Sequence, residues 1–123
     1  MNKLRIGICG WGNVATGLFK TLQSNAAEIK KRSNLEIEII AIGARRDNPK
    51  CDPGNIVVER DIFKIIDHDI DVIVELIGGV DVARDLILKA LNAKKHVVTA
   101  NKAVIFNHGD ELFSVANKNG VKL

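Results

Sequence analysis

Aromatic side chains are scarce in this chain of 123 residues, and no basic cluster is interleaved with them. Aromatic residues make up 4% of the sequence, with one tryptophan and no tyrosine. Lysine and arginine alternate with aspartate and glutamate, so the net charge of +3 is spread along the chain. Nucleic-acid-binding surfaces combine a basic cluster with aromatic side chains for stacking. We therefore expect no nucleic-acid partner.

Long apolar runs are also absent. None reaches the roughly 18 residues that a membrane-spanning helix needs. The first apolar run is too short for a signal peptide and is interrupted by glycine. The apolar fraction of 46% and the charged fraction of 27% are typical of a soluble globular protein. We expect no membrane partner and a cytoplasmic location.

Cysteine and histidine are few and scattered along the chain. The two cysteines, Cys9 and Cys51, have no C-x-x-C neighbour, so a disulfide or metal site has little support and a reduced protein is favoured. Cys9 falls in an apolar run and is interpreted as a small core side chain, whereas Cys51 falls in a polar loop. The histidines, His68, His96 and His108, share no ligand spacing and are interpreted as structural or solvated. We expect no metal site.

Closely spaced glycines near the N-terminus are the main feature present. Gly10, Gly12 and Ala15 fit the pattern G-x-G-x-x-[G/A], between an apolar run and a helical pattern. In dinucleotide-binding domains these small residues allow a tight turn, a close approach to the pyrophosphate, and close packing of helix on strand. The N-terminus of the helix then attracts the phosphates. Glycines also form turns that bind nothing, but the flanking strand and helix favour a nucleotide site. The residues predicted to contact the pyrophosphate are Gly10, Trp11, Gly12, Asn13 and Val14.

Strand-like and helix-like segments alternate along the chain. This alternation predicts an α/β fold, a doubly wound parallel sheet of the Rossmann type with strand order 3-2-1-4-5. We expect one dinucleotide-binding domain over residues 1–123, with residues 121–123 as the start of a sixth strand that is cut before a further domain. The expected strands cover residues 4–9, 35–42, 56–58, 71–77 and 96–100. The expected helices cover residues 14–32, 62–66, 82–91 (capped by Asp81) and 110–119.

Ligands of such sheets bind outside the carboxyl ends of the strands, so the residues after each strand are the candidates. Arg45 and Arg46 follow the second strand, where an NAD site has an acidic residue for the ribose 2′-hydroxyl. A 2′-phosphate carries up to about −2 charge, and a charge-assisted contact with it contributes about 1.5–3 kcal/mol. The pair therefore favours NADP(H) over NAD(H) as the cofactor. Two alternatives stay open: a solvated basic pair beside Asp47, or a different register in which Asp47 binds the 2′-hydroxyl of NAD.

Two further strand ends carry candidate residues. Gly78 and Gly79 end the fourth strand, where their backbone can approach the nicotinamide ribose, although a plain strand-to-helix turn fits the spacing equally well. Thr99 and Lys102 lie at the end of the fifth strand. Lys102 can reach the cleft of the reactive ring and act through its charge, but a surface lysine fits the pattern as well. Glu75, inside the fourth strand, is either a functional carboxylate or the partner of a neighbouring polar group.

With these strand ends laid out, the chain resembles the N-terminal part of homoserine dehydrogenase over nearly its whole length. The glycine turn alone occurs in many dehydrogenases. Far more specific are the segments VELIGG (74–79), HVVTANKA (96–103) and HGDEL (108–112), whose order and spacing also match.

That resemblance implies an activity and a set of contacts. Enzymes of the family interconvert L-homoserine and L-aspartate 4-semialdehyde with NAD(P)(H), on the route from aspartate to threonine and methionine. Arg45 or Arg46 would bind the adenosine 2′-phosphate, and Lys102 would lie close to the transferred hydride in a supporting role. Ala15 replaces the commoner third glycine, which is tolerable because the packing needs only a small side chain. The other implied contacts are Gly10, Gly12, Asn13 and Val14 along the cofactor, and Gly78, Gly79, Thr99 and Lys102 at the nicotinamide end.

The resemblance does not cover the substrate-binding part of the family. There, an acidic substrate ligand and a proton-donating lysine belong to a domain that follows the cofactor domain. We therefore expect this chain not to turn over alone, and we assign the small-molecule substrate and a homo-oligomer to the full enzyme. Two alternatives stay open: the cofactor domain of another dehydrogenase, such as an amino-acid or diaminopimelate dehydrogenase, and a non-catalytic nucleotide-sensing or redox-sensing module.

Overall fold

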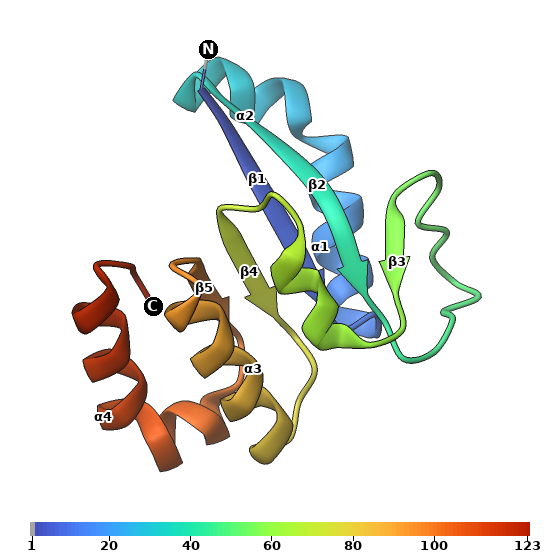
Figure 1. Cartoon of the computed structure of the whole chain (residues 1–123). Coiled ribbons are helices and arrows are strands. Elements are labelled where there is room, and N and C mark those ends of the chain that lie inside the picture. The colour runs from blue at the N-terminus through green and yellow to red at the C-terminus, as the bar shows by residue number, and fades with distance from the viewer. Residues whose placement is uncertain (1) are drawn as a thin grey trace.

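The computed structural model describes residues 2–123 as a sheet of parallel strands connected by helices (Figure 1). The strands are β1 (Asn2–Cys9), β2 (Leu35–Gly43), β3 (Val57–Glu59), β4 (Val72–Glu75) and β5 (His96–Thr99). The helices are α1 (Asn13–Ser24), α2 (Ala26–Ser33), the 3₁₀ helix η1 (Ile62–Asp67), α3 (Asp81–Asn92) and α4 (Lys102–Asn119).

The sheet has the strand order β3-β2-β1-β4-β5, and each neighbouring pair is parallel. This confirms the predicted doubly wound sheet and its order. The carboxyl ends of the strands lie in one row, because Cys9 pairs with Gly43 on one side and with Glu75 on the other. Glu75 in turn pairs with Thr99. The loops that leave these strands therefore emerge together at one edge of the sheet, where ligands of such folds bind.

Helices cover both faces of the sheet, with α1 on one face and η1 and α3 on the other (Figure 1). On the α1 face, Ile6 and Ile8 of β1 pack with Ala15. On the other face, a larger cluster joins the sheet to η1, α3 and α4. Complete burial of a leucine or isoleucine side chain contributes about 1.5–3 kcal/mol, so this cluster holds the helices firmly against the sheet. None of the helices in the described residues has the length and apolar character needed to cross a membrane.

The single helix expected over residues 14–32 is in fact two helices. α1 ends at Ser24 and α2 begins at Ala26, with Asn25 between them in a non-helical conformation. The side-chain amide of Asn25 donates to the Thr21 carbonyl at 3.0 Å. Such local bonds compete with continuation of the helix. α2 also has no buried residue, so no apolar stripe holds it in line with α1.

The last helix, α4, begins at Lys102 and not near residue 110 as expected. Asn101 caps it, because its side-chain oxygen accepts the Val104 N–H at 3.1 Å. Gly109 lies inside the helix, and this weak helix former hides the first half of α4 from a reading of the pattern. The correction matters for the site, because it places Lys102 in the first turn of a helix.

Two smaller expectations were also wrong. Asp81 is the first residue of α3 and not its cap, and Val80 stands at the capping position without a side-chain hydrogen bond. Residues 121–123 have no strand assignment. They nevertheless run beside β5, because the Val97 N–H donates to the Lys122 carbonyl at 3.0 Å.

Candidate functional site

The turn after β1 depends on Gly10. Its φ is +105°, a conformation that side-chain-bearing residues rarely adopt, and a Cβ there would stand 2.7 Å from the Leu76 carbonyl oxygen. Its N–H donates to the Gly43 carbonyl at 2.8 Å. The turn is therefore held against the ends of both neighbouring strands, and only glycine fits.

Gly12 is the N-cap of α1, and its backbone conformation and surroundings differ from those of Gly10. Its φ is −104°, and a Cβ there would meet no protein atom within 4 Å. The fold itself therefore does not require glycine at this position. No side chain caps the helix, and its first turn has no acidic residue. The N-terminus of α1 is thus bare and open, an arrangement that attracts anions.

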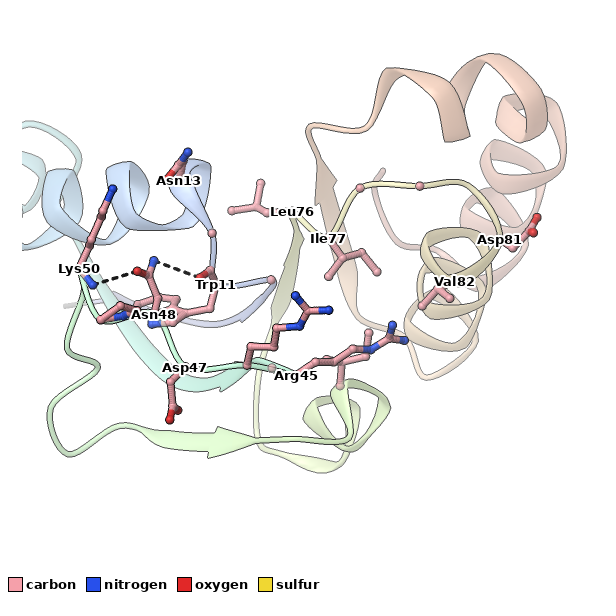
Figure 2. A pocket seen from close by; sticks show the side chains of 18 of the residues that line it. Trp11, Asn13, Arg45, Asp47, Asn48, Lys50, Leu76, Ile77, Asp81 and Val82 are labelled. Carbon is pink, nitrogen blue, oxygen red and sulfur yellow. Dashed lines mark hydrogen bonds between the residues drawn. The ribbon is translucent and has the colours of Figure 1, made fainter.

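A cleft of about 760 Å³ lies between this turn, the loop after β2 and the loop after β4 (Figure 2). Asn13 and Lys50 lie on one side of it and Val82 on the other, with Arg45 between them (Figure 2). The volume is within the range of small-molecule and cofactor sites. The predicted site residues that line this cleft are Gly10, Trp11, Gly12, Asn13, Arg45, Arg46, Gly78 and Gly79.

A second hollow, of about 350 Å³, adjoins the cleft on the side of α4. Gly78 lines both, and the second hollow is also lined by Val14 and Lys102, two more of the predicted site residues. Val14 is 63% exposed although it is apolar. Thr99 lines neither hollow. Its hydroxyl donates to Glu75, so Glu75 has the neighbouring polar partner that was one of its two interpretations.

Trp11 fixes the loop that follows β2. Its indole N–H donates to the Cys51 carbonyl at 3.2 Å, and the Asn48 side-chain amide donates back to the Trp11 carbonyl at 3.1 Å. The same amide reaches the Thr16 hydroxyl of α1 at 2.9 Å. The position of this loop, and with it the position of the two arginines, therefore depends on the glycine turn.

Arg45 and Arg46 bring positive charge to the cleft. Neither forms an ion pair within residues 2–123. Asp47, the acidic residue beside them in sequence, pairs with Arg60 instead. Arg60 also donates to the Ala44 carbonyl at 3.2 Å. The basic pair is thus not neutralised by its acidic neighbour.

Lys50 is a cleft residue that the sequence analysis missed. It lines the same cleft as the two arginines, and its backbone N–H donates to the Asn48 side chain at 3.0 Å. The path of a loop is not encoded by hydrophobic periodicity, so nothing local marked this lysine. Its only sequence signal is that it is a third cation in the segment after the second strand.

Both cysteines are buried free thiols. Burial and the nearby charge of Glu75 raise the pKa of the Cys9 thiol to about 12, so the thiol stays protonated and unreactive at neutral pH. Cys51 is 5% exposed although its surroundings in sequence are polar. In the part of the chain that the structure describes, no group of three or more histidine, cysteine or acidic side chains could hold a metal ion.

Comparison with known sequences points to one family. Residues 10–123 match the family model described as "Homoserine dehydrogenase, NAD binding domain". The homoserine dehydrogenase of Pseudomonas aeruginosa is 50% identical over 122 residues, which cover 98% of this chain and 28% of that protein. The chain thus spans little more than a quarter of the length of this curated relative.

Solved structures agree with this result. The crystal structure of a homoserine dehydrogenase from Thiobacillus denitrificans matches with a TM-score of 0.90 and 36% identity, over 98% of this chain and 28% of that one. A hyperthermophilic archaeal homoserine dehydrogenase in complex with NADPH shares the fold, with a TM-score of 0.78 and 23% identity over 98% of this chain and 42% of that one. The family match and the cleft at the strand ends together lead to one conclusion: the chain belongs to the homoserine dehydrogenase family and comprises its NAD-binding domain.

Proposed function

We propose that the chain binds NADP(H) as the cofactor domain of a homoserine dehydrogenase, which interconverts L-homoserine and L-aspartate 4-semialdehyde. Membership of the family and the 50% identity to a curated homoserine dehydrogenase support this proposal. A cytoplasmic homo-oligomer on the route from aspartate to threonine and methionine belongs to the same proposal. The reaction would also need the substrate domain, and neither a nucleic acid nor a membrane has a role in it.

One observation carries the assignment of the cofactor: a bare helix N-terminus and several unpaired cations face a single cleft. The N-terminus of α1 has neither a cap nor an acidic residue, and Gly12 leaves room above it. Arg45, Arg46 and Lys50 line the same cleft without an ion-pair partner among residues 2–123. A ligand with phosphates at two separate places matches both features. A neutral ligand would match neither.

The arrangement also supports one orientation of the cofactor. The pyrophosphate would lie over Gly12, and the adenosine 2′-phosphate would lie beside Arg45 and Arg46, a region that we name the arginine end of the cleft. The nicotinamide, which accepts or supplies the hydride, would lie beside Gly78 and Gly79, which we name the diglycine end. Lys102 lines the adjoining hollow, where its charge would act on the substrate or cofactor. The complex of the archaeal relative with NADPH supports this choice of cofactor.

Calorimetric titration of the chain with NADPH and with NADH tests the proposal. We expect NADPH to bind at least about tenfold more tightly, because a charge-assisted contact to the 2′-phosphate contributes about 1.5–3 kcal/mol. Arg45→Ala or Arg46→Ala should reduce this preference without changing the affinity for NADH. Arg32→Ala is the matched control, because Arg32 is exposed on α2 and lines no part of the cleft. Equal affinity for the two cofactors, or an unchanged preference in both cleft variants, would contradict the proposal.

A further inference from the structure

Glu75 is the only charged side chain that is fully buried in residues 2–123. It is the last residue of β4 and lies between Cys9 of β1 and Thr99 of β5 in the sheet. A carboxylate in such a place is strongly unfavourable unless hydrogen-bond donors surround it. The partners of Glu75 therefore decide what it does in the protein.

Those partners come from two different segments: Thr99 is the last residue of β5, and Ile77 lies in the loop after β4. One carboxylate oxygen accepts the Thr99 hydroxyl at 2.5 Å, and the other accepts the Ile77 N–H at 2.9 Å. The Thr99 oxygen also accepts the Asn101 N–H at 3.0 Å. The Asn101 side chain then donates to the Gly79 carbonyl. Together with the backbone from Ile77 to Gly79, these bonds form a closed ring that joins the end of β4 to the end of β5.

The backbone that the ring holds is the wall of the diglycine end. Gly78 and Gly79 both have a φ of +72°, and a Cβ on either would meet no protein atom within 4 Å. The space beside these two glycines is open, and the hydrogen bonds of Ile77 and Gly79 tie the turn to Glu75 and Asn101. On the other side of the ring, Asn101 caps α4 and so places Lys102 at the first position of that helix. One set of bonds thus sets the separation between the diglycine turn and Lys102.

We propose that Glu75 and Thr99 are positioning residues that hold the diglycine turn and Lys102 in the relative positions that the nicotinamide ring needs. The proposal rests on the proposed function, because it assumes that a nicotinamide cofactor occupies the cleft. It also changes the part assigned to Thr99. The Thr99 hydroxyl already donates to Glu75 and accepts from Asn101, so Thr99 acts through these two residues and not by touching the cofactor.

The test compares two ligands on the same variants of the chain. NADPH occupies both ends of the cleft, whereas adenosine 2′,5′-bisphosphate has the 2′-phosphate and lacks the nicotinamide. Thr99→Val keeps the shape of the side chain and removes both hydrogen bonds, and Glu75→Gln removes the charge. We expect each variant to weaken NADPH binding about tenfold and to change bisphosphate binding less than about twofold. Thr99→Ser restores the hydroxyl and should bind NADPH as the wild type does.

Two controls separate positioning from a general loss of structure. Thr21→Val makes the same chemical change on an exposed face of α1 and should alter neither affinity. A melting temperature measured for every variant identifies those that no longer fold. If the wild-type chain binds neither ligand, the proposed function fails. If the wild-type chain binds both ligands, the proposed function stands. The positioning role of Glu75 and Thr99 is then wrong if Thr99→Val weakens the binding of both ligands equally or of neither. It is also wrong if Thr99→Ser binds NADPH as weakly as Thr99→Val does.

Discussion

The arginine end and the diglycine end of the cleft use charge in opposite ways. At the arginine end the charged groups are exposed: the side chains of Arg60 and Asp47 are 53% and 87% exposed in their ion pair, and Arg45 and Arg46 line the cleft. At the diglycine end the carboxylate of Glu75 is 0% exposed, and its partners all belong to the protein.

This difference in exposure predicts different consequences for substitutions at the two ends. An exposed ion pair contributes about 0.2–1 kcal/mol, so substitutions at the arginine end alter what the cleft attracts more than how the chain folds. Removing a buried carboxylate is far more costly, because each buried donor that loses its acceptor costs about 1–3 kcal/mol. We therefore expect the arginine end to set the choice of cofactor, and the diglycine end to set its geometry.

The largest effect should come from Gly10→Ala, because Gly10 lies against both the end of β2, at Gly43, and the loop after β4, at Leu76. The substitution combines an unfavourable positive φ with a Cβ 2.7 Å from the Leu76 carbonyl oxygen. We expect a loss of about 3 kcal/mol in the free energy of unfolding, measured by urea denaturation. Gly17→Ala is the control, because Gly17 lies in α1, where a Cβ would meet nothing within 4 Å and alanine favours the helix. Equal stability of the two variants would show that the turn at Gly10 is not constrained.

A second prediction compares the two carboxylates directly. Glu75→Ala leaves the Thr99 hydroxyl and the Ile77 N–H without their acceptor, so we expect the free energy of unfolding to fall by about 2 kcal/mol or more. Asp47→Ala breaks an exposed ion pair and should lower it by less than about 1 kcal/mol. Urea denaturation of both variants measures the difference. Similar losses would remove the contrast between the two ends.

The smallest effect concerns the arginine end alone. Arg60→Ala releases Asp47, whose carboxylate would then repel the 2′-phosphate beside Arg45 and Arg46. We expect NADPH to bind about two- to threefold more weakly in calorimetry, with little change for NADH, since an exposed charge interaction is worth under about 1 kcal/mol. The double variant Asp47→Asn with Arg60→Ala should recover the affinity. A loss that persists in the double variant would mean that Arg60 acts by holding the Ala44 carbonyl.

Several features of the site followed from local sequence pattern. The Gly-x-Gly turn between a strand and a helix, the two glycines after β4 and the arginines after β2 all lie at the strand-end edge where they were expected. Local signals failed where they were weak or misleading. Gly109 concealed the first half of α4, and the bond from Asn25 to Thr21 divides a helix whose apolar spacing looked continuous.

The sequence by itself determined the order of the elements and the parallel sheet, because strand and helix periodicities and the connections between them are properties of short segments. The family followed from the resemblance carried by three specific segments, residues 74–79, 96–103 and 108–112. Only the tertiary structure decided which partner each polar side chain takes. Thr99 bonds to Glu75, Asp47 to Arg60 and Trp11 to Cys51, and each pair joins segments that are well separated in the chain. A hydrogen bond depends on distance and direction within a few tenths of an ångström, and no periodicity along the chain carries that information.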